Sequence, residues 1–245
     1  MKIYQVIARA MNFRPKQSHS CAGDCFVTKN KGIPRKDILL FVLSSCLLFS
    51  CTPVTQTNTQ TEVLTVYATF AAQPWMSELF ACANDLSVVL NVSALSPEIY
   101  LRVGEPEMLV SPAYQIDEEE ILIVTPRESP VQNLSLEEAQ ALFAGQGDPS
   151  VQVWVYSSEA DIQILFDQLV MKGRSVTSFA SVAVNPQAMS DTLNSESNAV
   201  GILPRHWKAG SIREVYSAGM APVLAIVKEE PRGVVIELIG CLQND

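Results

Sequence analysis

Residues 151 to 170 give the clearest indication of the fold, and they begin with Val151-Gln-Val-Trp-Val-Tyr156. β-Branched and aromatic residues dominate these six positions and favour a strand. After the short polar loop Ser157-Ser158, apolar side chains recur at the helical spacing i, i+3, i+4, i+7 and i+8, at Ile162, Leu165, Phe166, Leu169 and Val170. A strand followed by a short loop and an amphipathic helix is the repeating unit of an α/β fold.

The same alternation continues on both sides of this unit. We expect strands at 63–68, 86–92, 99–103, 120–125, 181–184, 199–203 and 221–228, and helices beginning near residues 74, 135, 185 and 231. Ser135 and Glu138 have the spacing of a capping box, which marks a helix start. The pattern predicts an α/β fold with mainly parallel sheets. We expect two lobes, divided near Thr125. Lobe 1 is expected at about 63–125 plus the C-terminal segment, and lobe 2 at about 126–220.

The N-terminal region has the features of an export signal. Residues 38–51 form an apolar and small-residue run that is too short to span a bilayer as a helix. Its end, Leu48-Phe-Ser-Cys51, resembles a bacterial lipobox, whose cysteine is acylated and becomes the first mature residue. We therefore expect a leader at 1–50 with a misassigned start codon, a lipidated Cys51, and a flexible Thr- and Gln-rich tether up to residue 62. An uncleaved N-terminal anchor is the alternative.

The charge of the part beyond the leader limits its partners. Of the 17 basic and 26 acidic residues, 9 and 24 lie beyond residue 50, which gives that part a net charge of −15. Such a surface repels phosphate backbones and anionic lipids, so we expect no nucleic acid partner and attachment to the cell membrane only through the lipid on Cys51. We expect the exported domain to be a monomer.

Two cysteines remain once the leader and Cys51 are set aside, Cys82 and Cys241. An even pair in an oxidising compartment predicts a disulfide between the first helix and the last. Two buried free thiols are the alternative, because cysteine is among the most often buried residue types.

Catalytic and metal-binding signatures are absent from the sequence beyond the leader. His206 is the single histidine there, and we interpret it as a surface or interlobe residue. The acidic run Asp117-Glu-Glu-Glu120 is interpreted as the solvated entry to the strand at Ile121. We expect no enzyme, no cofactor and no metal.

Three phrases of the chain resemble the type II periplasmic binding protein fold, in particular the phosphate-binding-protein-like substrate-binding domains. They are Pro130-Val-Gln-Asn-Leu-Ser-Leu-Glu-Glu-Ala-Gln-Ala-Leu-Phe-Ala-Gly145, Val153-Trp-Val-Tyr-Ser157 and Asn198-Ala-Val-Gly-Ile-Leu-Pro204. The resemblance extends from Val63 to the C-terminus. It implies two α/β lobes that close on a small ligand and present it to the permease of an ABC transporter.

In such a fold, the loops at the carboxyl ends of parallel strands offer free backbone N–H groups and the positive ends of helix dipoles to an anion. The candidate ligand-binding residues in those loops are Thr69, Phe70, Gly104, Ser157, Ser158 and Asn185. Arg102 and Arg127 are the nearest basic candidates. For Ser157, Ser158 and Asn185, helix capping without a ligand is the alternative.

One departure from the resemblance concerns the loop after residues 151–156. Phosphate-binding relatives usually carry a Ser-Gly-Thr cradle there, whereas this chain has Ser157-Ser-Glu-Ala-Asp-Ile162. Its two carboxylates would compete with a bound anion for the same N–H groups. Two functions therefore stay open. The first is an extracytoplasmic solute-binding lipoprotein of an ABC-type importer that binds a small anionic or polar ligand, for example an oxyanion. The second is a degenerate, ligand-free relative that serves as a cell-surface interaction or sensory module.

Overall fold

The computed structural model describes residues 62–244, which belong to the second of the chain's two units, residues 61–245. The leader at 1–50, Cys51 and the tether up to residue 61 lie outside the described residues. Within the described range, none of the helices combines the length and the apolar character that a membrane crossing requires.

A single eight-stranded sheet runs through the described part, in the order β2-β1-β3-β8-β4-β7-β5-β6. Strand β1 pairs in parallel with β2 and β3, and β5 pairs in parallel with β6 and β7. The remaining pairs, β3 with β8, β8 with β4 and β4 with β7, are antiparallel. The strands are β1 (Val63–Ala68), β2 (Val89–Val92), β3 (Ile99–Val103), β4 (Ala113–Pro126), β5 (Gln152–Val155), β6 (Ser181–Val182), β7 (Ala199–Pro204) and β8 (Ile212–Val227).

The helices lie between the strands, as the alternating sequence pattern predicts. They are α2 (Met76–Asp85), α3 (Leu136–Phe143), α4 (Asp161–Phe166), α5 (Pro186–Ser195) and α6 (Val234–Leu242). The 3₁₀ turn η1 (Gln73–Trp75) precedes α2, and the 3₁₀ turn η3 (Arg205–Trp207) follows β7. The π-helical turn η2 (Asp167–Met171) extends α4. The apolar stripe at 162–170 therefore spans α4 and η2 together.

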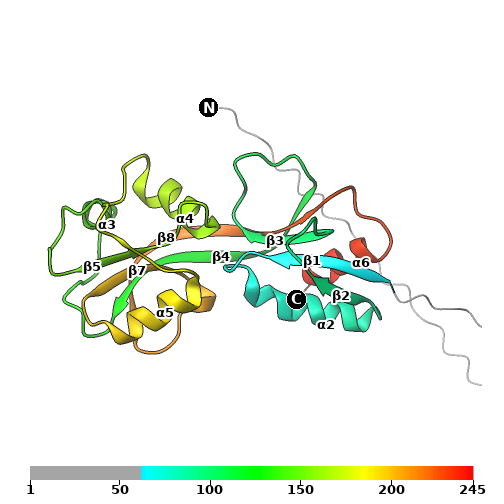
Figure 1. Ribbon diagram of the computed structural model, residues 1–245, viewed down its shortest axis with the longest axis horizontal. Helices are drawn as coiled ribbons and strands as arrows, with labels where there is room; N and C mark the ends of the chain where they lie inside the picture. The colour runs from blue at the N-terminus through cyan, green and yellow to red at the C-terminus, as the bar shows by residue number, and fades with distance from the viewer. Residues whose placement is uncertain (1–61, 245) are drawn as a thin grey trace, which may run out of the picture. The chain divides into compact units, whose positions relative to one another are not determined.

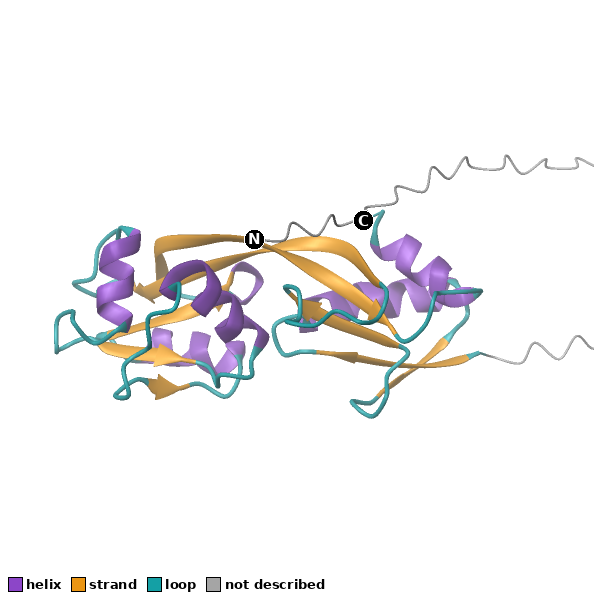
Figure 2. Ribbon diagram, turned by 90° about the horizontal axis from the view of Figure 1, so that it is seen from above, coloured by secondary structure: helices purple, strands orange, loops and turns teal. Residues whose placement is uncertain are grey.

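Strands β4 and β8 are the longest, with 14 and 16 residues, and they pass from one half of the described unit to the other (Figures 1 and 2). We call the half with β1–β3, α2 and α6 lobe 1, and the half with β5–β7 and α3–α5 lobe 2. The strands expected at 120–125 and 221–228 are too short. The missing part of β4, residues 113–119, pairs with residues 221–226 of β8, and the missing part of β8, residues 212–220, pairs with residues 120–126 of β4. Polar and glycine residues in the two missing parts hide the alternation that signals a strand.

The starts of α3 and α5 follow the local sequence, whereas the start of α4 does not. Ser135 and Glu138 form the expected capping box, with Ser135 N donating to Glu138 Oε2 at 2.8 Å and Glu138 N donating to Ser135 Oγ at 3.3 Å. Asn185 caps α5 by accepting from Ala188 N at 2.8 Å. At α4 the N-cap is Ala160, which has no side-chain cap. The capping interpretation of Ser157 and Ser158 is therefore wrong.

One hydrophobic core continues through both lobes along the central strands. Side chains of β3 and β4 such as Leu101 and Ile123 are fully buried, and Phe143 of α3 packs against Phe166 of α4 with ring centroids 4.6 Å apart. Each large side chain buried in this way contributes about 1.5–3 kcal/mol relative to exposure. Because the core residues lie between Leu64 and Leu242, the described unit carries its own core.

Cys82 of α2 and Cys241 of α6 are bonded in the structure, with their Sγ atoms 1.99 Å and their Cα atoms 6.0 Å apart. Both helices belong to lobe 1, and the two residues are 159 positions apart in sequence. The bond therefore fastens α6, the last helix of the described residues, to α2, the first α-helix among them.

Candidate functional site

The two lobes meet at Asp161, the first residue of α4. Its Oδ2 atom accepts a hydrogen bond from Thr69 Oγ1 at 2.5 Å and another from the backbone N of Val103 at 3.2 Å. Its Oδ1 atom accepts from the N of Ile162 at 3.0 Å. Thr69 follows β1 and Val103 ends β3, so both belong to lobe 1, whereas α4 belongs to lobe 2. Asp161 is 7% exposed, so a buried carboxylate with three donors joins the lobes.

Gly104, directly after β3, makes a second contact between the lobes. Its φ of +76° is a conformation that side chains disfavour. A Cβ atom at this position would lie 2.6 Å from Leu165 Cδ2 of α4. The backbone of lobe 1 therefore approaches α4 as closely as only a glycine permits.

A third group of contacts lies where η3 follows β7. Trp207 Nε1 donates to the carbonyl oxygen of Ala71 in the loop after β1, at 3.2 Å. The ring of His206 packs against Trp75 of η1 with centroids 4.7 Å apart, and Trp75 Nε1 donates to Asp117 Oδ2 at 2.9 Å. These contacts bring the β1 loop of lobe 1 against the segment after β7 of lobe 2.

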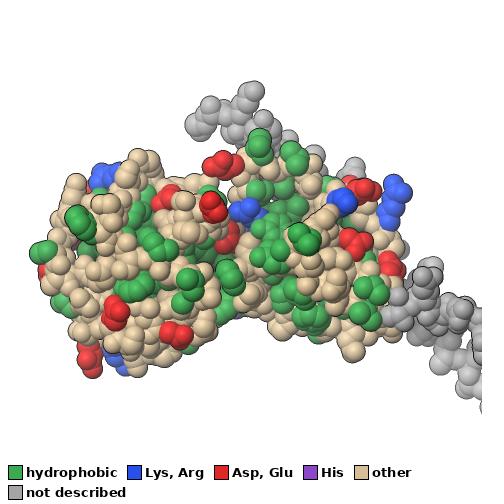
Figure 3. Space-filling model, in the orientation of Figure 1, with side chains coloured by type: hydrophobic (Ala, Val, Ile, Leu, Met, Phe, Trp, Pro, Cys, Tyr) green, Lys and Arg blue, Asp and Glu red, His purple; other side chains and the backbone are tan. Residues whose placement is uncertain are grey.

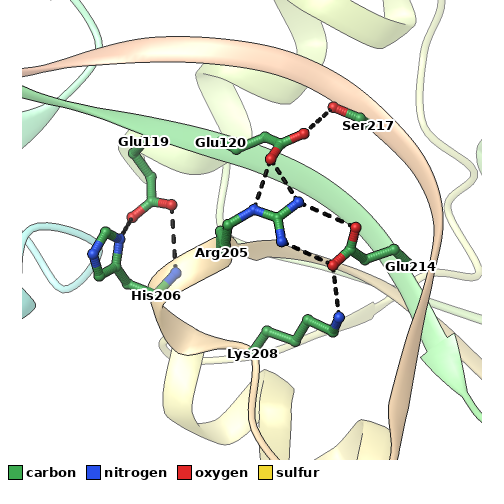
Figure 4. Close-up of polar contacts among 7 residues, drawn as sticks. All are labelled: Glu119, Glu120, Arg205, His206, Lys208, Glu214 and Ser217. Carbon is green, nitrogen blue, oxygen red and sulfur yellow. Dashed lines mark hydrogen bonds and ion pairs between the residues drawn. The ribbon is translucent and has the colours of Figure 1, made fainter.

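Glu119, in the middle of β4, binds His206 of this group through hydrogen bonds. Glu119 is 1% exposed, and its carboxyl group is hydrogen-bonded to His206 Nδ1 at 2.7 Å and accepts from His206 N at 3.4 Å (Figure 4). Burial raises the pKa of Glu119, and the hydrogen bond and the charge of His206 oppose that rise. The interpretation of residues 117–120 as a solvated strand entry is wrong at this position. The histidine is an interlobe residue with a half-exposed side chain.

An ion-pair network holds η3 on the two long strands. Arg205 donates from Nε to Glu120 of β4 at 2.7 Å and from two further nitrogens to Glu214 of β8 at 3.0 and 3.2 Å (Figure 4). Lys208 Nζ donates to Glu214 Oε1 at 2.6 Å. Ser217 Oγ donates to the second oxygen of Glu120 at 2.5 Å. The bond from Lys208 lowers the pKa of Glu214, and the bond from Ser217 lowers that of Glu120.

Two tyrosines and an arginine lie beside the Asp161 contact. Tyr67 of β1 and Tyr100 of β3 stack with centroids 5.8 Å apart. Burial raises the pKa of Tyr100; Arg102 lowers it, and Asp161 and Tyr67 add to the rise, so these charges lie near its hydroxyl. The Nε atom of Arg102 is buried and has no hydrogen-bond partner among residues 62–244. Arg102 is therefore a cation near the junction that no carboxylate of the described part neutralises through an ion pair.

A pocket of about 430 Å³ opens on lobe 1 next to the stacked tyrosines. Its lining includes Tyr67, Tyr100, Ser111 and Lys228 and none of the residues that join the lobes. Loops nearby expose Met108 and Val110, and Figure 3 shows hydrophobic side chains gathered on this side of the molecule. Within the described range no group of three His, Cys, Asp or Glu side chains is placed to hold a metal ion.

The sequence candidates fall into different environments. Thr69 and Gly104 both contact α4, so the structure brings these two together at the junction. Phe70 is 52% exposed. Ser157 and Ser158 are exposed in the loop before α4, where the Ser157 carbonyl accepts from Ala160 N. The side-chain oxygen of Asn185 is used by its own helix.

Sequence reasoning did not find several residues of the junction. Asp161 is recognisable as an acid in the first turn of a helix, but its bond to Thr69 spans 92 positions and leaves no local pattern. Trp207 and Glu119 likewise depend on partners far away in sequence. The one local signal is the pair of acidic residues, Glu159 and Asp161, at the start of α4.

Comparison with known proteins supports the fold. No protein-family model matches the sequence, and no curated protein matches it. Among solved structures, the chain is similar to a Clostridium perfringens protein described as a phosphate ABC transporter substrate-binding protein with bound phosphate. That likeness has a TM-score of 0.66 and 15% identity, over 74% of this chain and 93% of the other.

Two further structures show the same likeness. An ABC-type phosphate transport receptor from Vibrio cholerae matches with a TM-score of 0.58 and 15% identity, over 74% of this chain and 94% of that one. The reduced regulatory domain of OxyR2 from Vibrio vulnificus matches with a TM-score of 0.58 and 9% identity, over 75% and 95%. The chain thus has a type II periplasmic binding protein-like fold with two lobes. At these identities the likeness defines the fold alone.

Proposed function

We propose that the chain is an extracytoplasmic solute-binding lipoprotein of an ABC-type importer, and that it binds a small polar ligand between its lobes. The observation that carries this proposal is the junction itself. The loops after β1 and β3 of lobe 1 meet the start of α4 of lobe 2, and hydroxyl, backbone N–H and carboxylate groups converge there. In open α/β sheets, ligands bind at the carboxyl ends of strands in this way.

The long strands β4 and β8 support a role that needs motion between the lobes. They connect the lobes through residues 113–126 and 212–227, and their pairing is interrupted by register shifts at three places. Bulges bend strands and increase local twist. Binding proteins close by hinge motions of a few connecting residues, and these two strands are where such a hinge would lie.

Lipidation of Cys51 is the second part of the proposal and has its own test. Cells that express the full chain should incorporate labelled palmitate into it, and the Cys51→Ser variant should lose the label. Cys46→Ser, five residues earlier in the same apolar run, is the matched control and should keep the label. Equal labelling of the native chain and the Cys51→Ser variant would rule out the anchor at this residue.

A ligand-free relative that acts as an interaction or sensory module is the second candidate. It is favoured by the hydrogen bond that Thr69 donates to Asp161 and by the contact of Gly104 with Leu165, because both fill the junction with groups of the chain itself. The two candidates differ in whether a small molecule stabilises the folded protein.

A thermal-shift screen of residues 62–245 against amino acids, sugars, carboxylates, polyamines and oxyanions separates them. A ligand at a hundred times its Kd stabilises the native state by about 2.7 kcal/mol. We expect one class to raise the unfolding midpoint and Thr69→Ala to abolish that rise. Ser77→Ala, an exposed hydroxyl on α2 that bonds only to its own turn, is the control and should keep it. Silence across the panel from a cooperatively folding protein would contradict solute binding and favour the interaction module.

A further inference from the structure

Asp161 occupies the position in the junction that an anionic ligand would need. The donors that point there are the hydroxyl of Thr69 and the backbone N–H groups of Val103 and Ile162, and its carboxylate already accepts from all three. The bonds come from both lobes and from three separate segments of the chain. A carboxylate that is 7% exposed and bonded in this way fills the junction as a bound anion would.

The internal carboxylate has two advantages over a free anion. First, it is tethered to α4, so it competes at the high effective concentration of an intramolecular partner. Second, it carries a negative charge that no Lys or Arg of the described part neutralises in an ion pair. The charges of Arg102 and Asp161 both shift the pKa of Tyr100, but Arg102 forms no ion pair with Asp161 in the described part. A phosphate or sulfate that entered would find these donors occupied and would face the like charge of Asp161.

We infer that Asp161 is the specificity-determining residue of the interlobe site: it acts as an internal ligand that holds the lobes together and excludes small oxyanions. The inference rests on the proposed function, because it names the ligand class of the same site. A ligand that binds there must be neutral or cationic, so that it can accept from Thr69 or donate to Asp161 without bringing a second negative charge. Hydroxyl and amine groups have this chemistry.

Equilibrium dialysis of the full chain in detergent with radiolabelled inorganic phosphate, and separately with sulfate, tests the inference. The variants are Asp161→Gly, which frees the three donors, and Asp161→Gly with Thr69→Ala, which removes one donor again. Glu159→Gln is the matched control, because it removes one negative charge two residues away from a side chain that is exposed and joins no lobe contact. Thermal unfolding of each variant shows that it is folded.

We expect the native chain and Glu159→Gln to bind either oxyanion only weakly. Asp161→Gly should bind at least about tenfold more tightly, because the competent state is no longer suppressed by the internal carboxylate, and the added Thr69→Ala should reverse the gain. Native binding as tight as that of Asp161→Gly, an equal gain in Glu159→Gln, or no gain in a folded Asp161→Gly chain would each overturn the inference. The proposed function fails by a different result, which is the absence of any ligand for the native chain in the wider screen.

Discussion

Gly104 is the residue at which a single methyl group would disturb the junction most directly. A Cβ there meets Leu165 across the lobes, and its φ is +76°. Gly173, after η2, has a similar φ of +89° but nothing within 4 Å of an added Cβ. Comparing substitutions at Gly104 and Gly173 therefore separates the effect of backbone strain, which both positions share, from the effect of steric contact, which of the two only Gly104 has.

We expect Gly104→Ala to lower the free energy of unfolding by about 1–3 kcal/mol more than Gly173→Ala does, which is the usual range for overpacking. Urea unfolding of both variants and the native protein gives the two differences. Equal effects of the two substitutions would mean that Gly104 is not packed against Leu165 in solution.

Glu119 makes stability depend on pH in a direction opposite to most carboxylates. Burial raises its pKa above the ordinary value near 4.5. Its stabilising contribution is therefore complete below that value and is lost as the pH rises through the raised pKa. We expect the stability of the native protein relative to Glu119→Gln to fall from pH 4.5 upward, as measured by urea unfolding at a series of pH values.

Glu138 provides the control for this measurement. Its bonds to Ser135 lower its pKa, the backbone bond being the larger cause. The native protein should therefore gain stability relative to Glu138→Gln as the pH rises toward 4.5, the opposite slope. Slopes of the same sign for the two glutamates would contradict the burial of Glu119 beneath His206.

At the scale of elements, the helix starts show which local signals are sufficient. The capping box at Ser135 and the cap at Asn185 can be read from a few adjacent residues, and the structure contains both. The start of α4 could not be predicted in this way. Ala160 offers no side-chain acceptor, and the role of Asp161 depends on lobe 1.

The capping box gives a prediction for α3. Ser135→Ala should destabilise the protein by about 0.5–2 kcal/mol, because Glu138 N loses its acceptor at the helix start. Ser158→Ala, in the loop before α4, removes an exposed hydroxyl outside any cap and should stay within about 0.5 kcal/mol of the native value. Thermal or urea unfolding measures both. A larger effect at Ser158 than at Ser135 would contradict the assigned helix start of α4.

Strands β4 and β8 mark the limit of sequence prediction for elements. The ends that apolar residues dominate were predictable, whereas residues 113–119 of β4 and 212–220 of β8 form strand because each pairs with the apolar part of the other strand, at 221–226 and 120–126. Pairing over such a distance is a property of the tertiary fold. The connection between the lobes was for this reason the least predictable part of the architecture.

On the scale of the whole molecule, the disulfide fastens the ends of lobe 1. Closing a loop of this length restricts the unfolded chain, and loss of such a bond typically lowers stability by roughly 2–5 kcal/mol. Reductant should therefore lower the unfolding midpoint of the native protein and leave that of the Cys82→Ala, Cys241→Ala double variant unchanged. An unchanged native midpoint together with two titratable thiols would show that the cysteines are free.

The two-lobed fold as a class was predictable from the alternation of elements and from three phrases of the resemblance. The chemistry at the junction was only partly so. Thr69 and Gly104 were identified as loop residues, but the side chains that contact them, Asp161 and Leu165, come from α4 in the other lobe. A loop position can be inferred from a strand end, whereas its partner across a cleft cannot.

The interlobe distance in the absence of ligand tests most directly whether Asp161 holds the lobes together. Spin labels at Phe80→Cys on α2 and Phe179→Cys in lobe 2, both exposed positions, can be introduced into residues 62–245, whose two native cysteines are bonded to each other. Double electron–electron resonance should give one narrow distance for the native sequence and for Glu159→Gln, and a longer, broader distribution for Asp161→Gly. Identical distance distributions for the native sequence and Asp161→Gly would contradict the inference that Asp161 holds the lobes together.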